Sequence, residues 1–182
     1  MNVASELRLP RPAHPSEDIA ARLARYRWPD GRRMQMFDAM ANSPNAFRDL
    51  STATTCCLTG EIVPRSREIL ILRVLALTKA EAEHELHVAL FANEVGLSDA
   101  EIGALSRCTV LPDLFDGREK LLVSLAEEIV GQHNLTDATW DGLVTHFSPG
   151  QLAELLMIAT QYLKVAVLNN ALRILEPKGD EN

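Results

Sequence analysis

The chain has 182 residues, of which 47% are apolar and 24% are charged, a composition typical of one ordinary globular domain. Its net charge of −7 at pH 7 disfavours non-specific binding to nucleic acid, because contacts with phosphates need a basic surface. Three cysteines do not make a disulfide framework, and the first residues do not read as a secretory signal, so we expect a reduced, cytoplasmic protein.

The N-terminal third is expected to form an extended arm followed by helices. Three prolines in residues 1–15 indicate the arm. A helix over 16–27 begins with a capping serine, and the Pro-Asp-Gly sequence at 29–31 predicts a turn. A short helix around 34–40 and a longer one over 44–59 complete this part. We therefore expect residues 1–60 to contribute an arm and helices to a single compact domain whose helical core is 61–176.

Two helices between Pro64 and Gly96 are the part around which the chain is organised. The first has apolar residues on every side, which is typical of a helix buried in a core. Glu68 and Arg73 on it are expected to be buried and therefore to need partners. Thr78, with a glutamate three residues later, predicts a capping box for a second helix that ends at Gly96.

The remaining segments also predict helices, and we find no alternating strand pattern. Helices are expected over 99–107, over 117–132, from Thr136, and from Pro149 to about 175, with a loop over 109–116. Polar residues interrupt the apolar part of the last helix, so no membrane span is expected. The prediction is an all-α fold of about eight or nine helices.

Several ionisable side chains of the central helices are expected to meet. Glu83 and His87 are four residues apart and share one face of a helix, and His84 lies three residues before His87. Together with Glu68 they predict two carboxylates and an imidazole between two buried helices. Such a group suits proton transfer at a carbon next to a carbonyl or a lactone, without a cofactor.

Three motifs of this region, taken together, resemble the carboxymuconolactone decarboxylase-like family of the alkylhydroperoxidase D-like superfamily. The motifs are REILILRVLAL at 67–77, EAEHELH at 81–87 and GLSDAEI at 96–102. The resemblance to the longer members covers nearly the whole chain. It implies an all-helical alkylhydroperoxidase D-like fold and a homo-oligomer, which we expect to be a dimer, trimer or hexamer.

The resemblance also bears on the chemistry. In the peroxidase branch, a Cys-x-x-Cys pair precedes the histidine by seven and four residues, and a glutamate precedes it by nineteen. Here the glutamate and histidine are matched by Glu68 and His87, but Ala80 and Glu83 stand at the cysteine positions. Thiol peroxidase chemistry is not expected at this site, because it lacks a thiolate nucleophile. Other members read Glu-Trp-x-x-His, which Glu83 and His87 match, while His84 replaces the aromatic residue.

The preferred function is therefore a cofactor-free lyase or isomerase that acts on a small carboxylated or lactone substrate. Glu68, Glu83 and His87 are the expected catalytic residues. Arg73, His84 and Tyr162 are expected to bind the substrate, although Arg73 could instead pair with Glu68 or Glu83.

Several alternatives stay open at this point. The protein could be an antioxidant oxidoreductase of the alkylhydroperoxidase or peroxiredoxin type, or a non-catalytic oligomer in which the same residues form a buried ion-pair network. We do not expect a metal site, because His84 and His87 are three residues apart rather than the four of the zinc signature, although Glu68, Glu83 and His87 could still form a mixed carboxylate–imidazole site. The adjacent Cys56 and Cys57 are most simply small buried residues, with a redox role as the alternative, and Cys108 is expected to be incidental.

Overall fold

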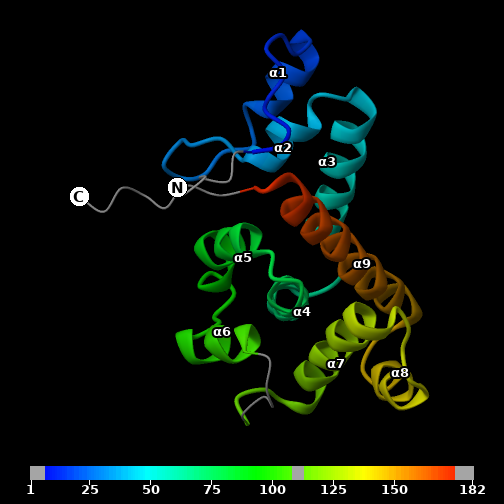
Figure 1. Ribbon diagram of the computed structural model, residues 1–182. Coiled ribbons are helices and arrows are strands. Elements are labelled where there is room, and N and C mark those ends of the chain that lie inside the picture. The colour runs from blue at the N-terminus through cyan, green and yellow to red at the C-terminus, as the bar shows by residue number, and fades with distance from the viewer. Residues whose placement is uncertain (1–6, 108–112, 175–182) are drawn as a thin grey trace. The chain divides into compact units, whose positions relative to one another are not determined.

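The computed structural model describes residues 7–107 and 113–174, and in these it is all-helical. The described residues form nine α-helices and one π-helical segment, with a single isolated antiparallel bridge between Arg27 and Arg33 (Figure 1). The expected fold class is confirmed. The helices are α1 (Glu17–Leu23), α2 (Gln35–Met40), α3 (Pro44–Thr59), α4 (Pro64–Leu77), α5 (Glu81–His87), the π-helical segment (Val88–Ala92), α6 (Asp99–Ser106), α7 (Gly117–Gln132), α8 (Asp137–Val144) and α9 (Pro149–Leu172).

The chain divides into two compact units. One contains the residues up to Cys56 and the segment that begins at Leu168, and the other is Cys57–Val167. Helices α3 and α9 each contribute to both units. The domain limits expected at 1–60 and 61–176 stay a prediction, since a division by contacts does not test which part folds with which.

The first unit is built on an aromatic cluster. Ser16 caps α1 as expected, its hydroxyl accepting a hydrogen bond from the backbone N–H of Ile19. The rings of Tyr26 and Phe37 stack with centroids 3.6 Å apart, and Phe47 of α3 meets Tyr26 edge-on at 6.0 Å. Such ring pairs add to the free energy gained by burying their apolar area. They fix α2 and α3 relative to the loop that follows α1.

Helix α4 is the core of the second unit. It is buried without interruption from Ser66 to Leu75, as expected from its apolar residues on every side. Figure 1 views α4 end-on, with α5 and α6 on one side and α7 on the other, and all three contact it. Because every side of α4 is covered, its charged residues must find partners inside the protein.

The connection between α4 and α5 corrects the prediction of a capping box at Thr78. Thr78 ends α4 instead, where its hydroxyl donates to the carbonyls of Val74 at 2.7 Å and Leu75 at 3.1 Å. Lys79 then adopts a left-handed conformation with φ +55°, and α5 begins at Glu81. Thr78 is the C-cap of α4, and the residue before α5 is Ala80, whose side chain cannot make a capping hydrogen bond.

The helix expected to run to Gly96 changes its form immediately after His87. Residues Val88–Ala92 are π-helical, and a left-handed Gly96, φ +76°, lies in the turn beyond them. The capping boxes expected at Ser98 and at Ser148 are both present. These two capping boxes were thus predictable, whereas the start of α5 and the π-helical turn were not.

Helix α9 is long and apolar enough, by length and composition, to cross a membrane. Of the most apolar 18-residue window in it, 44% is buried inside the protein, and core helices of soluble proteins share this length and composition.

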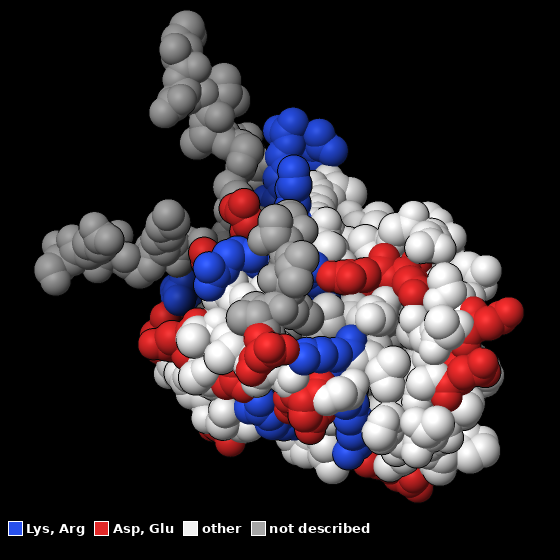
Figure 2. Space-filling view, turned by 90° about the horizontal axis from the view of Figure 1, so that it is seen from below, with Lys and Arg blue, Asp and Glu red and all other residues white. Residues whose placement is uncertain are grey.

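On the face of the molecule that Figure 2 shows, acidic and basic side chains are interspersed rather than gathered by sign.

Candidate functional site

The centre of the candidate site is a pair formed by Glu68 of α4 and His87 of α5. Glu68 Oε2 lies 2.7 Å from His87 Nδ1, and the two side chains are 0% and 2% exposed. The two helices form a hairpin, so residues nineteen apart in the sequence face each other. The carboxylate accepts a hydrogen bond from Nδ1–H, which fixes the tautomer and leaves Nε2 to exchange protons with another molecule.

Arg67 binds the other carboxylate oxygen of Glu68. The sequence pattern had not singled out Arg67 as a site residue. Its Nε lies 3.1 Å from Glu68 Oε1, and its Nη1 donates to the carbonyl of Leu58 at 3.0 Å. We call the buried series Arg67, Glu68 and His87 the relay. The rule that buried charges need partners applies to Arg67 as much as to Glu68, and would have singled it out.

Glu83 closes the other side of the imidazole. Its Oε1 is 3.8 Å from His87 Nε2, and its side chain is 17% exposed. Burial raises the pKa of Glu83, and the neighbouring His87 opposes this shift. A carboxyl with a raised pKa can hold a proton closer to neutral pH than an ordinary glutamate does. The structure thus brings together the three residues that the sequence predicted to be catalytic.

Tyr162 of α9 also belongs to this cluster. Its ring meets His87 edge-on with centroids 4.9 Å apart. The pKa of Tyr162 is raised well above its ordinary value, first by burial and then by Glu83, Glu68 and Cys57, while Arg67 lowers it. The hydroxyl therefore lies within electrostatic range of the relay and of a cysteine thiol.

The π-helical segment supplies one more wall of the site. Phe91 lies in it, with its ring centroid 5.1 Å from that of His87. A π-helical turn is wider than an α-helical one and is found frequently at functional sites. Its position directly after His87 marks this part of the hairpin as unusual.

Arg73 lies away from the Glu68–His87 pair. Its guanidinium binds Glu127 of α7 and the carbonyls of Leu105, at 2.9 Å, and Arg107. It pairs with neither Glu68 nor Glu83, which corrects that expectation. The Arg73 guanidinium joins α4 to α6 and α7 and does not contact the Glu68–His87 pair.

His84 lies beside a separate cavity of about 500 Å³. Its Nε2 is 3.1 Å from the hydroxyl of Ser106, and the cavity is also lined by Leu75, Lys79 and Glu81. Burial lowers the pKa of His84, and the nearby His87 lowers it further. The substrate-binding roles expected for Arg73, His84 and Tyr162 stay predictions, but only Tyr162 contacts His87.

The two adjacent cysteines differ in exposure. Cys57 is buried as expected, whereas Cys56 is exposed, which corrects the expectation that both are buried, and neither is in a disulfide. Cys108 lies outside the described residues. Among the residues that the structure describes, no group of three or more His, Cys, Asp or Glu side chains is arranged to hold a metal ion.

Comparison with known proteins supports the fold. The sequence matches no family model, and no curated protein matches it. A peroxidase-related, uncharacterised protein from Silicibacter sp. TM1040 superposes with a TM-score of 0.79 at 12% identity, over 93% of this chain and 90% of that one. A protein of unknown function from Agrobacterium tumefaciens, provisionally named as the antioxidant defence protein AhpD, gives 0.68 at 18% identity, over 76% and 94%. At these identities the likeness establishes a fold of the alkylhydroperoxidase D type.

Proposed function

Starting from this alkylhydroperoxidase D-like fold, we propose that the protein is a cofactor-free enzyme that moves a proton on a small carboxylated or lactone substrate, as a lyase or an isomerase. The observation that carries the proposal is the 2.7 Å contact between the buried side chains of Glu68 and His87. Arg67 binds the other carboxylate oxygen of Glu68. A buried imidazole with one nitrogen fixed by a carboxylate is arranged to transfer protons through the other nitrogen.

In the proposed reaction, His87 Nε2 removes a proton from a carbon next to the carbonyl of the substrate. Glu68 stabilises the imidazolium that forms, and Arg67 holds Glu68 in place by binding its other carboxylate oxygen. Glu83, with its raised pKa, returns a proton to the substrate at a second carbon. His87 then passes its proton to Glu83, which restores both groups, and the net result is an isomerisation in which the proton lost from one carbon is replaced at another.

The direction of approach follows from exposure. Among Glu68, Glu83 and His87, the side chain of Glu83 is the most exposed, at 17%. A substrate therefore reaches Nε2 from the side of Glu83, and the 3.8 Å between Glu83 Oε1 and Nε2 is longer than a hydrogen bond. Such contacts often tighten only when the substrate is bound.

The test measures consumption of a carboxymuconolactone by the wild type and by His87→Gln and Glu83→Gln. We expect each substitution to lower turnover by about 10²-fold or more, the usual contribution of a general acid or base. His146→Gln is the control, because this histidine is exposed and lies outside the candidate site, and it should keep turnover within about threefold of the wild type. Unchanged circular dichroism shows that the variants fold. Full turnover in folded His87→Gln would contradict the proposal.

A second candidate is a thiol-dependent peroxide reductase that uses Cys57. Two observations favour it. Cys57 contributes to the raised pKa of Tyr162, and Arg67 binds the backbone carbonyl of Leu58, the residue after Cys57. The thiolate would attack a hydroperoxide and give a sulfenic acid and an alcohol, and two molecules of an external thiol would restore the cysteine as they form a disulfide and water. Loss of peroxide reduction in Cys57→Ser but not in Cys56→Ser would select this function over proton transfer.

Assembly into a homo-oligomer in the cytoplasm is also part of the proposal. Helix α9 has Met157 and Val167 at 63% and 58% exposure, apolar area that a second copy could cover. Light scattering after size-exclusion chromatography measures the assembly.

A further inference from the structure

A loop over residues 26–34 in the first unit, closed by backbone hydrogen bonds, holds a group of arginines, and we call it the arginine loop. The backbone N–H of Met34 donates to the carbonyl of Tyr26 at 3.1 Å, and that of Trp28 donates to Arg32 at 2.9 Å. Gly31, with φ +87°, makes the turn, and its N–H donates to the carbonyl of Trp28. These bonds fix the loop backbone before any ligand binds, which reduces the entropy lost on binding.

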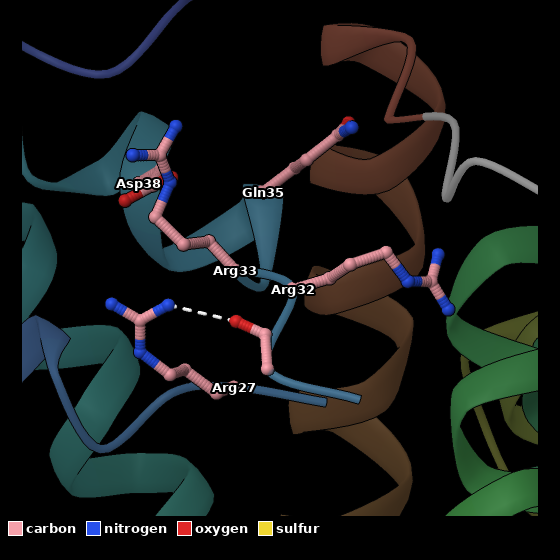
Figure 3. Close-up of a pocket in the computed structure, with 6 residues that line it drawn as sticks. Arg27, Arg32, Arg33, Gln35 and Asp38 are labelled. Carbon is pink, nitrogen blue, oxygen red and sulfur yellow. Dashed lines mark hydrogen bonds and ion pairs between the residues drawn. The ribbon is translucent and has the colours of Figure 1, made fainter. Parts of the chain in front are cut away.

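Within this loop, an antiparallel bridge places Arg27 opposite Arg33. Residues directly opposite each other across such a bridge project to the same face, and two like charges in these positions are destabilising. Figure 3 shows the Arg27 and Arg33 side chains extending to one side of the loop, whereas Arg32 extends to the other. Arg32 lies over the Trp28 ring and pairs with Asp30 at 2.6 Å.

The carboxylate of Asp38 lies beside these arginines and binds two guanidinium groups. Asp38 accepts from Arg33 Nε at 2.9 Å and from Arg11 Nη1 at 3.2 Å, so that one carboxylate serves two guanidinium groups. Arg27 donates to a carbonyl, that of Gly31, at 2.8 Å. Arg11, Arg27 and Arg33 thus carry more positive charge than Asp38 balances, in a chain whose net charge is −7.

A cavity of about 420 Å³ lies between these side chains. This is within the range of small-molecule sites in proteins. Its lining consists of Arg27, Gly31, Arg32, Arg33, Gln35 and Asp38.

We propose that this cavity binds the phosphate group of a small molecule between Arg27 and Arg33. A guanidinium fork binds two oxygens side by side, so two forks on one face match a tetrahedral group with three terminal oxygens. A single carboxylate offers only two oxygens and occupies one fork. The bound phosphate also removes the repulsion between the paired arginines.

The test is a calorimetric titration of the full chain with inorganic phosphate at constant ionic strength. We expect saturable binding to the wild type, and a loss of about tenfold or more in affinity for Arg27→Gln. Arg48→Gln is the matched control, because Arg48 is an exposed arginine of the same unit that bonds to Asn45 outside the cavity. This variant should bind phosphate as the wild type does.

Two further measurements make the test decisive. Arg27→Lys keeps the charge but loses the fork, so we expect affinity between those of the wild type and Arg27→Gln. Acetate, whose single planar carboxylate can occupy only one fork, should bind more weakly than phosphate. Equal affinity for acetate and phosphate, or binding of phosphate that is unchanged in Arg27→Gln, would overturn the proposal.

Discussion

The relay and the arginine loop hold their charges in opposite ways. In the relay, Arg67, Glu68 and His87 are buried, and each binds another member of the series. In the loop, two arginines lie opposite each other, and the side chain of Arg33 is 54% exposed. A charge removed from water must therefore be matched within the chain, whereas an exposed charge is available to bind a ligand.

The largest effect is expected when the relay is broken. Glu68→Gln leaves the buried guanidinium of Arg67 without a carboxylate. We expect the free energy of unfolding to fall by about 3–5 kcal/mol, because an uncompensated buried charge is costly. Urea denaturation monitored by circular dichroism measures the change.

A double variant distinguishes the effect of losing the Arg67–Glu68 ion pair from the effect of losing side-chain packing. Replacing Arg67 by Met as well as Glu68 by Gln removes both charges, so the double variant should be less destabilised than the sum of the two single variants. If the two effects only add, Arg67 and Glu68 do not stabilise each other and the description of the relay is wrong.

An intermediate effect is expected at Arg65, which is half-buried. Its guanidinium binds Glu101 of α6 and, at 2.7 Å, Glu119 of α7. Burial alone would raise the pKa of Glu101, but hydrogen bonds from Ser98 and Arg65 outweigh it and lower the pKa from 4.5 to about 2. Arg65→Met should therefore cost about 1–2 kcal/mol of unfolding free energy at pH 7.

The sign of the pH dependence follows from the lowered pKa. The unfolded chain takes up a proton at Glu101 before the folded chain does, so the contribution is present above pH 4.5 and is lost as the pH falls toward 2. Denaturation midpoints measured between pH 7 and pH 3 should converge for the wild type and Arg65→Met. Parallel curves would show that Glu101 does not depend on Arg65.

The smallest effect on stability is expected in the loop. Arg27 is exposed and donates to a carbonyl, so Arg27→Gln should change the free energy of unfolding by less than about 0.5 kcal/mol in the absence of phosphate. Thermal unfolding followed by circular dichroism measures this. A larger loss would mean that Arg27 holds the loop together, and the contrast with Glu68→Gln would disappear.

Much of the fold was predictable because its signals are local. Ser16, Ser98 and Ser148 cap helices as expected, since a capping side chain bonds to a backbone group only three residues away. The buried character of α4 followed from its apolar residues on every side. The spacing of Glu83 and His87 on one helix face also placed both in the candidate site.

What could not be predicted depends on contacts between distant residues or on a choice between two local bonds. Arg73 pairs with Glu127, which is 54 residues away and carries no signal that links the two. Thr78 had carbonyls of α4 and the N-terminus of α5 as possible partners, and the pattern of residues does not rank them. The residues of the π-helical turn after His87 are of no type that would indicate such a turn in the sequence.

The edge-on contact between Tyr162 and His87 gives the protein an optical probe of its own. The chain contains two tyrosines, and Tyr162 is 1% exposed. Because its pKa is raised well above the ordinary value, the hydroxyl keeps its proton while the protein is folded even in alkaline solution in which an exposed tyrosine would lose it. The near-ultraviolet absorbance of tyrosinate then reports when solvent reaches the ring that packs against the imidazole. Events at the candidate site can thus be followed without attaching a label.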